Sequence, residues 1–361
     1  MSAAFDILVG GAPAEDLVDR LGGLEVEEHA DRPGAFTLTL AAATTDQEDL
    51  DVVADARFGP MANIAVVARA AEGPDHCLID GYVLAQSLNL DRSGGAASLR
   101  VWGQDASWLM NMEEKAREWA DVTDGAVADS IFGEYGFAPA AGNSSDASPT
   151  HTETGHTLMQ RATDAQFLQN LARRSGKLCR VYCEDMPGVR TGWFARPKLD
   201  GEPAITLIAA GPDANLEEID ISWDIMRPVA VAAHQALFSA AETAGGDVDD
   251  STLALLGDQA LSAFAGQPVK AMLTAMVDDG GELTTRAQAV LGEAGWFVRC
   301  EGSADAQLIG GILRVGSVAM LNNAGTVHSG KYLVWSVRHT ITAESHVMAF
   351  TLVRNAVGAG R

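Results

Sequence analysis

The stretch HSGKYLVWSVRHTITAESHVMAFTLVRNA, residues 328–356, decides the fold class of this chain. A short polar break at residues 343–345 separates two runs that are rich in apolar side chains. From residue 332 to 341 the alternation assigns side chains to two faces: Tyr332, Val334, Ser336 and Arg338 on one, Leu333, Trp335, Val337 and His339 on the other. This period of two predicts strands. Neither face is uniformly apolar, so we expect a core on one side and a neighbouring subunit or a lumen on the other, as in a barrel wall.

Composition and charge narrow the classes of protein to which the chain can belong. The 361 residues are 47% hydrophobic, which is enough for two or three packed domains of roughly 100–200 residues each. The 25 basic and 49 acidic residues give a net charge of −24, and such a chain repels the phosphates of nucleic acid. Two explanations of the charge stay open. One is a solvated surface from a high-GC or salt-tolerant source, and the other is an acidic wall that keeps DNA or acidic cargo from sticking.

The hydropathy of the sequence argues against membrane insertion. No run of the sequence reaches the ~18 consecutive apolar residues of a membrane span. The start of the chain, MSAAFDILVGG, lacks the basic segment that begins a secretory signal. We therefore expect a protein that is made in the cytoplasm.

Residues 1–104 form a β-rich unit. Strands are expected at 25–29, 35–41, 64–70, 77–86 and 98–102, with turns or breaks at 10–11, 72–75 and 91–95. The acidic stretch 47–56 is expected to be a short helix or an extended loop. Strands at this spacing, with turn signals between them, predict a sandwich or a barrel.

Residues 105–214 form a mixed α+β section. Trp108, Met112, Ala116 and Trp119 recur at helical spacing and predict a first helix. Further elements are expected as helices at 123–135 and 163–175, strands at 177–184, 191–196 and 204–208, and a surface loop at 140–153. The helix at 163–175 begins at Thr163 or Asp164 as its cap, and Gly176 ends it.

Residues 215–361 return to β structure. Strands are expected at 216–225, 229–238, 297–302, 312–321 and 332–354, and a helix at 283–294 with Thr284 or Thr285 as its cap. The insertion 239–281 contains alanine- and leucine-rich helical pieces, and we interpret it as a decoration outside the core.

Motifs for metal binding or redox chemistry have little support. His151 and His156 are five residues apart, whereas a zincin helix needs histidines at i and i+4, so we expect exposed loop histidines. Cys179 and Cys183 lie in one predicted strand, where four residues separate the sulfurs by roughly 13 Å. That distance excludes a disulfide or a shared zinc in an undistorted strand. We expect free, half-buried thiols.

Motifs for catalysis are equally weak. Gly176 and Lys177 do not belong to a phosphate-binding loop, and no G-x-S-x-G elbow occurs. Paired acids are expected on solvated faces: Glu27-Glu28, Glu113-Glu114, Glu217-Glu218 and Asp249-Asp250. His339 and His346 are expected to be hydrogen-bonded histidines of a barrel, and Trp102, Trp108 and Trp119 to be core residues. We therefore expect no catalytic, cofactor-binding or metal-binding residues, no cofactor and no enzymatic activity.

Groups of residues between about 100 and 355 resemble the phage late-control D family, the baseplate hub proteins of contractile tails. They are RVWGQD at 100–105, ADVTDGAVADSI at 120–131, QRATDAQFLQNLARRSGKL at 160–178, LRVG at 313–316, GKYLV at 330–334, VRH at 337–339 and FTLVRN at 350–355. The same fold is similar to the amino-terminal part of type VI secretion spike proteins. Thr163 stands where the family more often has serine, and either residue caps a helix. The insertion 239–281 has no counterpart that we can place.

The resemblance implies a fold and an assembly. The expected fold class is α+β, mainly β: two tube-like β-barrel domains at 1–104 and 215–361, joined by an α+β domain at 105–214, with the insertion 239–281. The chain is expected as a homotrimer whose barrels form a pseudo-sixfold ring. Such a ring adapts a hexameric tail tube to a trimeric spike and contacts other baseplate proteins. Because the chain stops at Arg361, shortly after the last strand, we expect the spike to be a separate polypeptide.

The function implied by the resemblance is that of a structural baseplate hub in a contractile phage tail or phage-tail-like injection system. The protein is expected to be assembled into such a particle, with nucleic acid or protein cargo passing through the lumen without specific binding. Two alternatives stay open. One is a tail-associated cell-wall-degrading enzyme, for which 239–281 is the candidate domain, although it is small for a catalytic cleft. The other is a glycan-binding β protein, which the scattered tryptophans allow.

Overall fold

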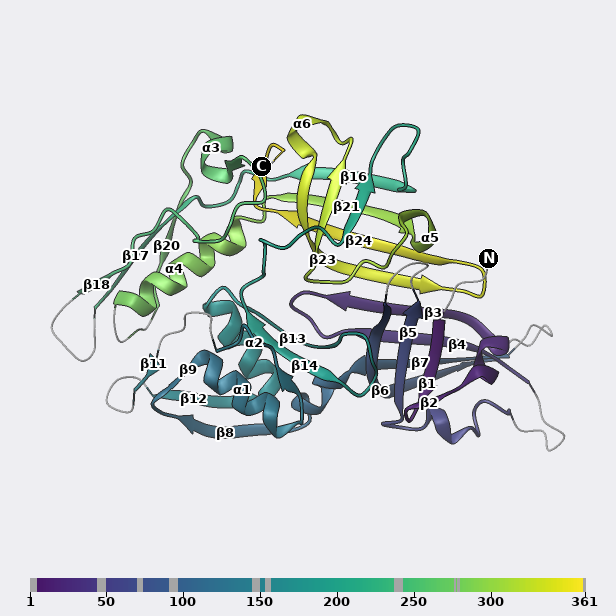
Figure 1. Cartoon of the computed structure of the whole chain (residues 1–361). Coiled ribbons are helices and arrows are strands. Elements are labelled where there is room, and N and C mark those ends of the chain that lie inside the picture. The colour runs from purple at the N-terminus through teal and green to yellow at the C-terminus, as the bar shows by residue number, and fades with distance from the viewer. Residues whose placement is uncertain are drawn as a thin grey trace.

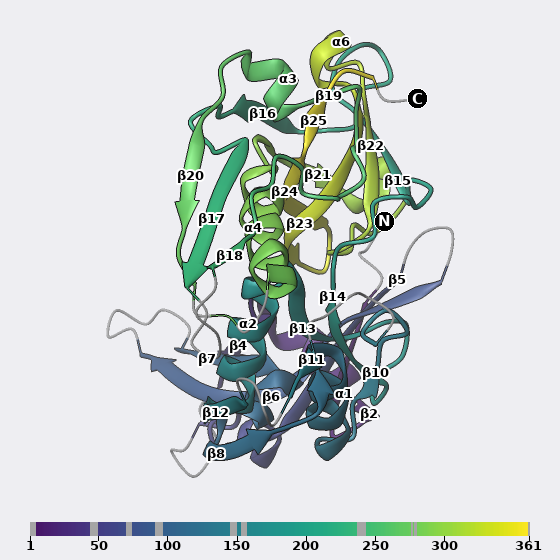
Figure 2. The same ribbon diagram turned by 90° about the vertical axis from the view of Figure 1, so that its left-hand side faces the viewer.

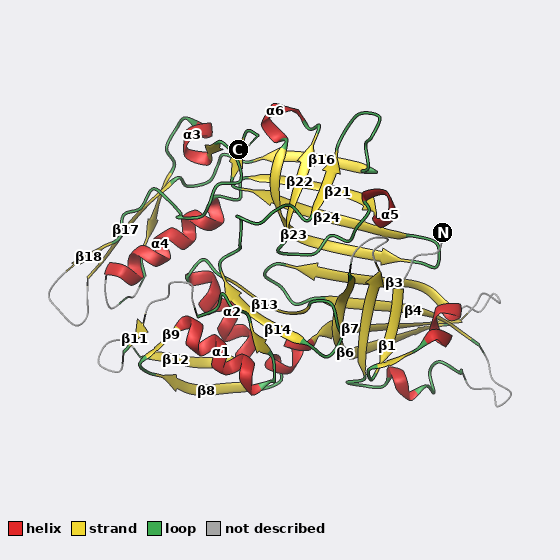
Figure 3. Cartoon of the chain, viewed as in Figure 1, coloured by secondary structure: helices red, strands yellow, loops and turns green. Residues whose placement is uncertain are grey.

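A computed structural model describes residues 5–43, 50–69, 74–90, 97–144, 150–152, 157–236, 243–275, 277 and 280–359. Strands dominate these residues and the helices are short (Figure 1, Figure 3). The expected class, α+β and mainly β, is confirmed. Of the helices described, none is long and apolar enough to cross a membrane.

Strands from both ends of the chain pair into one 13-stranded sheet. The strands of the first unit are β1 (Phe5–Val9), β2 (Ala12–Pro13), β3 (Leu21–His29), β4 (Ala35–Ala42), β5 (Asn63–Arg69), β6 (Asp75–Asn89) and β7 (Ala97–Asp105). The remaining strands are β15 (Ile205–Ile208), β16 (Glu218–Trp223), β21 (Val298–Asp305), β22 (Val318–Asn322), β23 (Gly330–Ile341) and β24 (His346–Arg354). The main path runs β16-β21-β24-β23-β3-β4-β7-β6-β5-β1-β2, and its central step joins the two β units through β23 and β3.

The expected pair of closed barrels is not found among the described strands. Each unit has an edge strand whose main-chain groups need partners. Here β3 and β23 supply those partners to each other, so the two units share one open sheet. The division of the chain into domains at residues 104 and 214 stays a prediction, although β15 pairs with β22 of the last unit.

A β-bulge at Trp335 explains the uneven pattern of the closing hairpin. The register of β23 against β24 shifts between Val334 and Ser336. One extra residue reverses the alternation of side chains, so that a strand changes faces at the bulge. As a result Tyr332 and Val334 before the bulge face the same core as Val337 and Ile341 after it. The expectation of one continuous alternation from 332 to 341 is therefore wrong.

The opposite face of β23 also has neighbours within the chain. Leu333 is fully buried and packs with Leu199, Leu256 and Val353. The patterning of the hairpin therefore does not require a second subunit, which removes it as an argument for ring assembly.

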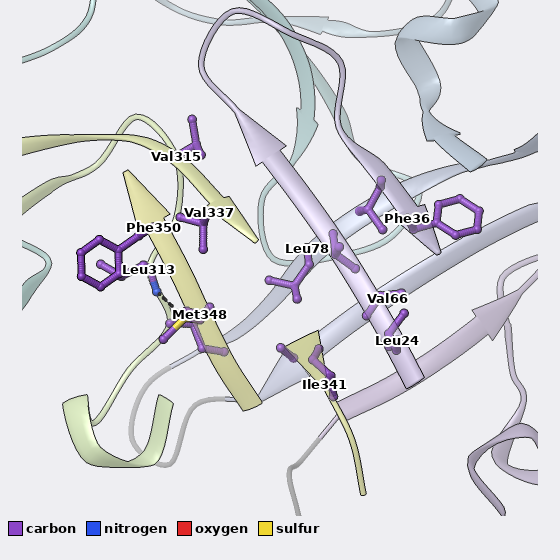
Figure 4. Packing of buried hydrophobic residues seen from close by; sticks show 14 of the residues in the cluster. Leu24, Phe36, Val66, Leu78, Leu313, Val315, Val337, Ile341, Met348 and Phe350 are labelled. Carbon is purple, nitrogen blue, oxygen red and sulfur yellow. Dashed lines mark hydrogen bonds between the residues drawn. The ribbon is translucent and has the colours of Figure 1, made fainter. Parts of the chain in front are cut away.

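The main hydrophobic core is continuous across both units. Leu24, Phe36, Val66 and Leu78 from the first unit and Leu313, Val315, Val337, Ile341, Met348 and Phe350 from the last belong to one cluster (Figure 4). The amide of Leu313 donates to Met348 Sδ at 3.4 Å, which fastens the loop before β22 to β24. The two units thus fold around shared apolar surface.

Most expected strands of the first unit are present, with longer bounds. The turn at Gly10 and Gly11 joins β1 to β2, and their φ angles of 57° and 80° are the left-handed values that glycine adopts easily. Short 3-10 helices, η1 (Glu15–Arg20) and η2 (Ala56–Phe58), follow β2 and precede β5. The break at 91–95, residues 72–73 of the expected turn and residues 47–49 of the acidic stretch lie outside the described residues.

The middle section packs two helices on short strands around a core of its own. Its elements are η3 (Ala106–Asn111), β8 (Glu114–Trp119), β9 (Val122–Thr123), α1 (Asp124–Glu134), β10 (Ala138–Pro139), β11 (Thr150–His151), β12 (Leu158–Thr163), α2 (Asp164–Arg174), β13 (Leu178–Cys183) and β14 (Arg190–Ala195). Both expected helices, 123–135 and 163–175, are confirmed as α1 and α2. The apolar face of α2 is buried through Phe167, Leu168 and Leu171.

The helix expected through Trp108 to Trp119 is wrong in its second half. A short 3-10 helix, η3, ends at Asn111, and β8 follows as a strand. Pairing decides the conformation, because β8 forms an antiparallel ladder with β12 from Trp119 opposite Leu158 to Glu114 opposite Thr163. Tertiary pairing thus overrides a helical spacing of apolar residues.

The insertion and its flanks build a small lobe, made of β17 (Ala230–Ala236), β18 (Thr243–Gly245), β20 (Lys270–Leu273) and α4 (Gly280–Ala294). The strands form a sheet in the order β18-β17-β20, and α4 lies along it (Figure 2). Val231, Ala233, Leu283, Ala287 and Leu291 form its buried core. The lobe also contacts the middle section, through α4 and α2.

The structure changes the expectations for this region. The strand at 229–238 does not continue the large sheet, since β17 pairs with β18 and β20 of the lobe. The described part of the insertion contains strands, β18, β20 and β19 (Gln259–Ala260), as well as the expected helical pieces, α3 (Leu261–Ala265) and the start of α4. Thr284 and Thr285 lie inside α4, and their hydroxyls donate to Gly280 O and Gly281 O one turn earlier. Other short elements are α5 (Ala306–Ile309), α6 (Gly325–His328) and β25 (Ala356–Val357).

Candidate functional site: the seam between the two β units

We use the word seam for the pairing of β3 with β23. The ladder is antiparallel and runs from Ser336 opposite His29 to Ile341 opposite Leu24. Since β3 lies near the start of the chain and β23 near its end, this ladder is where the two β units join. Side chains of the seam point alternately to the shared core and to the outer face of the sheet.

The core face of the seam carries a buried carboxylate. Glu28 is 8% exposed and His339 is fully buried. Arg314 approaches Glu28 with Nη2 at 2.9 Å from Oε1, and His339 Nε2 lies 3.2 Å from Oε2. Burial alone would raise the pKa of Glu28, but Arg314 and His339 outweigh it and lower that pKa to about 2. Glu28 is therefore ionised in the fold.

The charge on Glu28 sets the tautomers of two histidines. An ionised carboxylate only accepts, so His339 donates from Nε2 and its Nδ1 is left as an acceptor. His346 Nε2 lies 3.0 Å from that Nδ1 and donates to it. Burial lowers the pKa of His339, and burial together with the charge of His339 lowers the pKa of His346 to about 3. We call Glu28, Arg314, His339 and His346 the seam cluster. The expectation of two hydrogen-bonded histidines is confirmed.

Arg314 connects the seam cluster to the middle section. Its Nη2 donates to Cys183 O at 3.0 Å and its Nη1 donates to Glu184 O at 3.2 Å, at the end of β13. One guanidinium from the last unit thus contacts both the first β unit and the middle section. Its chemistry is that of a structural clamp, because its donors are used within the chain.

The outer face of the seam is polar and hollow. Glu27 and Arg338 form an ion pair at 2.8 Å and are 50% and 58% exposed. A groove of about 800 Å³ lies over this face. It is lined by residues of β3, β16, β21, β23 and β24 and of the segment that follows β3, including Asp31, Arg32, Asp220, Arg299, Glu301, Trp335, Ala349 and Thr351. Both signs of charge line the groove.

The motif residues of the middle section begin its two helices in the same way. Thr123 accepts from the amide of Ala126 at 3.2 Å, and Thr163 accepts from the amide of Gln166 at 3.3 Å. Each threonine caps its helix. An aspartate follows each threonine, and both aspartates, Asp124 and Asp164, are fully buried.

Asp124 has three hydrogen-bonding partners, and one of them is His151. His151 Nε2 lies 2.7 Å from Asp124 Oδ1, and the hydroxyl of Ser175 donates to Asp124 Oδ2 at 2.7 Å. Arg174 Nη2 lies 3.2 Å from Oδ1. Burial would raise the pKa of Asp124, but His151, Arg174 and Ser175 outweigh it and lower that pKa. The expectation of an exposed His151 is wrong, because this histidine is 5% exposed as a partner of Asp124.

Asp164 has an equivalent set of partners. The hydroxyl of Tyr135 and the amide of Gln160 donate to it, each at 2.6 Å, and Lys115 forms an ion pair with it. The aspartate therefore ties α2 to α1, β12 and β8. The acids of both motifs act as anchors of the fold.

The last motif clamps the end of the chain. Arg354 is fully buried, and its guanidinium donates to the carbonyls of Leu256, Ser329 and Gly358. The space for it depends on glycine, since a Cβ on Gly330 would lie 2.5 Å from Arg354 Nη2. A positive charge is thus balanced by carbonyl dipoles.

Asn355 fastens the insertion to the last strand. Its Oδ1 accepts from the amide of Leu256 at 2.9 Å, and its Nδ2 donates to Ala254 O at 2.8 Å. The insertion therefore binds the closing hairpin through both Arg354 and Asn355. This contact assigns a structural role to a segment that the sequence suggested was a decoration.

Other candidate residues lie apart from the seam. The four cysteines are free thiols and are buried more deeply than expected. Within the described ranges, no group of three or more His, Cys, Asp or Glu side chains could hold a metal ion. His156 lies outside those ranges, and the absence of a metal site stays a prediction. Lys177 follows the end of α2 and leads into β13, as its sequence context predicts.

The paired acids and the tryptophans divide between surface and core. Glu113-Glu114, Glu217-Glu218 and Asp249-Asp250 are exposed as expected. Glu28 contradicts the expectation for its pair. Trp108 and Trp119 are half-buried, whereas Trp102 is 40% exposed, so a core position for Trp102 is wrong.

The sequence contains a signal for Glu28 that pattern reading missed. Leu24, Val26 and Glu28 share a face by their spacing of two, and the first two are fully buried. An acid on the apolar face of a strand implies a buried partner. The partner, Arg314, lies |i−j| = 286 away along the chain, beyond the reach of any local pattern.

A family model described as the Alg8 N-terminal domain matches residues 2–343. The chain belongs to the Alg8 N-terminal domain family. A search of curated proteins returned no match. Membership of the late-control D family itself stays a prediction.

Solved structures share the fold of this member of the Alg8 N-terminal domain family. The 43 kDa tail protein of prophage MuSo2 from Shewanella oneidensis is 14% identical, with a TM-score of 0.67 over 99% of this chain and 100% of that one. A tail protein from Neisseria meningitidis MC58 is 13% identical, with a TM-score of 0.68 over 98% and 97%. The E. coli c3393 protein, a component of the type VI secretion system, is 11% identical, with a TM-score of 0.56 over 98% and 78%. The expected resemblance to tail and baseplate proteins is therefore confirmed at the level of the fold.

Proposed function

We propose that this protein is a structural baseplate hub of a contractile phage tail or phage-tail-like injection system. It assembles as a homotrimer, joins a hexameric tail tube to a trimeric spike, contacts other baseplate proteins and catalyses no reaction. Nucleic acid or protein cargo passes through the lumen of the ring without specific binding. The protein is made in the cytoplasm and assembled into the particle.

The observation that carries this proposal is the likeness to tail proteins along the whole chain. The two tail proteins from Shewanella oneidensis and Neisseria meningitidis cover 99% and 98% of it, so both β units and the middle section have counterparts. A likeness confined to one domain would instead fit a shared module on an unrelated protein.

The role of the motif residues supports a structural protein. Asp124, Asp164, His339 and Arg354 are all fully buried, and each is bonded to other parts of the chain. A catalytic group needs a cleft in which it can reach a substrate. These side chains instead connect different sections of the chain, as expected of a structural protein.

The open sheet supports assembly. Strand β16 ends the main path of the sheet, and Trp223 at its end is 49% exposed. Met226, which follows it, is 87% exposed. A strand with a free edge and apolar neighbours is a site where another chain can pair. We propose that β16 contacts a neighbouring subunit in the trimer and closes the barrel there.

The oligomeric state tests the proposal. Native mass spectrometry of the protein, alone and with the tube and spike proteins of the same particle, is expected to show three copies of the 37.9 kDa chain, about 114 kDa. Trp223→Asp is expected to weaken the trimer. Leu308→Asp on α5 is the matched control, because Leu308 is also exposed, at 66%, and α5 follows the end of β21 that is opposite to Val298, the partner of Trp223. A stable monomer that binds neither tube nor spike contradicts the proposal.

A second candidate function, glycan binding, rests on the groove over the seam. Trp335 lies beside carboxylates and arginines in a volume of about 800 Å³, which suits a short oligosaccharide. Isothermal titration with peptidoglycan fragments and capsular oligosaccharides tests this function. Saturable binding that Trp335→Ala removes supports it, and the absence of binding rejects it. A cell-wall-degrading activity stays a prediction that peptidoglycan zymography tests.

A further inference from the structure

Two cysteines meet where the first β unit contacts the middle section. Cys77 lies near the start of β6, and Cys183 ends β13. The amide of Cys77 donates to Glu184 O at 3.0 Å, so the two backbones run side by side at this point. The thiol of Cys183 donates to Cys77 O at 2.9 Å, which brings Sγ of Cys183 onto the backbone of Cys77.

The two side chains form a small cluster of their own. Cys77 is fully buried, Cys183 is 3% exposed, and both pack with Val67. The other two cysteines pack elsewhere, Cys179 in the core of the middle section and Cys300 in the main core. The chain therefore contains one pair of facing thiols and two separate ones.

The surroundings of Cys183 bear on its reactivity. Burial raises the pKa of the Cys183 thiol well above its usual value, and a hydrogen bond with the Cys77 thiol raises it further. Arg314 acts in the opposite direction, because its positive charge favours the thiolate. Burial outweighs the charge of Arg314, so Cys183 stays a protonated thiol in the closed fold, and its thiolate forms once local opening hydrates it.

We propose that Cys77 and Cys183 are a modification site at which a disulfide forms between the first β unit and the middle section. The oxidant is a small-molecule disulfide such as oxidised glutathione. The thiolate of Cys183 attacks one sulfur of that disulfide and displaces one glutathione thiolate, which gives a mixed disulfide on Cys183. The thiolate of Cys77 then attacks Sγ of Cys183 and displaces the second glutathione. The two cysteines lose two protons and two electrons, and oxidised glutathione takes them up to become two thiols.

The geometry of the contact suits this bond. A disulfide needs Cα atoms about 4.4–6.8 Å apart. The hydrogen bond from the Cys77 amide to Glu184 O and the contact of Cys183 Sγ with Cys77 O bring the two residues side by side. Because both groups are buried, access of the oxidant requires local opening between β6 and β13, so formation is slow in the folded protein. This inference does not depend on the proposed function, although it predicts a more rigid protein in an oxidising environment.

Oxidation of the purified, reduced chain tests the proposal. The protein is incubated with oxidised glutathione in a urea concentration below its unfolding transition, then denatured and alkylated. A linked peptide that contains Cys77 and Cys183 is expected, with a loss of about 2 Da from the intact mass before alkylation. Because the bond closes a loop between residues |i−j| = 106 apart, the melting temperature is expected to rise by roughly 5 °C or more, reversibly on reduction.

Single substitutions separate this pair from the other thiols. Cys77→Ala and Cys183→Ala are expected to abolish both the linked peptide and the rise in melting temperature. Cys179→Ala and Cys300→Ala are the matched controls, since both residues are buried, and these variants are expected to keep both effects. A linkage that includes Cys179 or Cys300, or no linkage at all under these conditions, overturns the proposal.

Discussion

The two faces of the seam carry neighbouring ion pairs in opposite environments. Glu27 and Glu28 are adjacent in β3, and each has an arginine partner at 2.8–2.9 Å. Glu27 and Arg338 are half or more exposed, whereas Glu28 is 8% exposed and also contacts His339. The two ion pairs therefore have similar distances but very different exposure to water.

The difference teaches that burial, and not distance, decides what an ion pair does. An exposed pair contributes about 0–1 kcal/mol because water screens it. A buried pair contributes little net stability when it is intact, but losing one partner leaves an uncompensated charge and costs about 3–5 kcal/mol. The seam cluster therefore favours one alignment of β3, β23 and the loop that carries Arg314. In that alignment all of its charges have partners, and any other alignment would leave a buried charge unpaired.

The largest expected effect is that of Glu28→Gln. The amide leaves Arg314 without a carboxylate in a buried site, so the free energy of unfolding is expected to fall by about 3 kcal/mol. Urea unfolding followed by circular dichroism measures it. A loss below about 0.5 kcal/mol contradicts the account of the seam, because that is the range of an exposed pair.

Acidification is expected to destabilise the protein through the same cluster. The pKa of His346 is about 3 in the fold, below the 6.5 of an unfolded histidine, and the pKa of His339 is lowered as well. The unfolded chain therefore binds more protons below pH 6.5, and stability falls as the pH falls through that value. His346 contributes a loss of about 2 kcal/mol between pH 7 and pH 5, and His339 contributes a loss in the same direction. Glu28 adds a further loss as the pH falls from 4.5 toward 2, where its folded pKa lies.

A buried acid outside the cluster, Asp105, partly offsets this loss of stability at low pH. Burial raises the pKa of Asp105 to about 6, against the hydrogen bonds from Ser107 and Gly34 that lower it. Stability from this group rises as the pH falls from 6 to 3.8. Unfolding measured at pH 7, 6 and 5 gives the net slope. His346→Gln is expected to flatten it, and Thr340→Ala, which alters an exposed residue of the same hairpin that does not titrate, is expected to leave it unchanged. Equal slopes in both variants refute the assignment.

The bulge at Trp335 predicts which neighbouring residues of β23 belong to the core. Val337→Ala removes two buried carbon atoms and is expected to lower the free energy of unfolding by about 1.5 kcal/mol. Ser336→Ala on the outer face is expected to change it by less than about 0.5 kcal/mol. The reverse order of the two effects would place the bulge elsewhere in the strand.

The smallest effect is expected for the exposed pair. Arg338→Ala removes the partner of Glu27, and the free energy of unfolding is expected to change by less than about 0.5 kcal/mol at 0.15 M salt. The same unfolding assay measures it beside Glu28→Gln. Equal losses in the two variants would erase the distinction between the faces.

Local patterns in the sequence predicted the elements that local chemistry controls. Thr163 caps α2 and Gly176 follows its end, with a φ of 68°. The turn at Gly10 and Gly11 is also as expected, because glycine adopts its left-handed backbone angles more easily than other residues do. These features depend on residues within a few positions of one another.

Long-range pairing produced the features that the sequence did not show. The conformation of β8 depends on β12, more than thirty residues later, and the partner of Glu28 is Arg314. The bulge at Trp335 shifts the pattern of β23 by one residue, so alternation counted without it placed Val337 on the face opposite to Tyr332 and Val334. The resemblance in the motifs predicted a mainly β fold, whereas the joining of the two units in one open sheet and the polar contacts at the seam depend on residues that lie far apart in the chain.

One measurement tests the central claim most directly: a reconstruction by electron cryomicroscopy of the particle that contains this chain. The account predicts three copies in a ring between the hexameric tube and the spike, with the Glu28–Arg314 contact intact in each and β16 against a neighbouring copy. A position outside that junction, or a single copy bound to the surface of the particle, would contradict it.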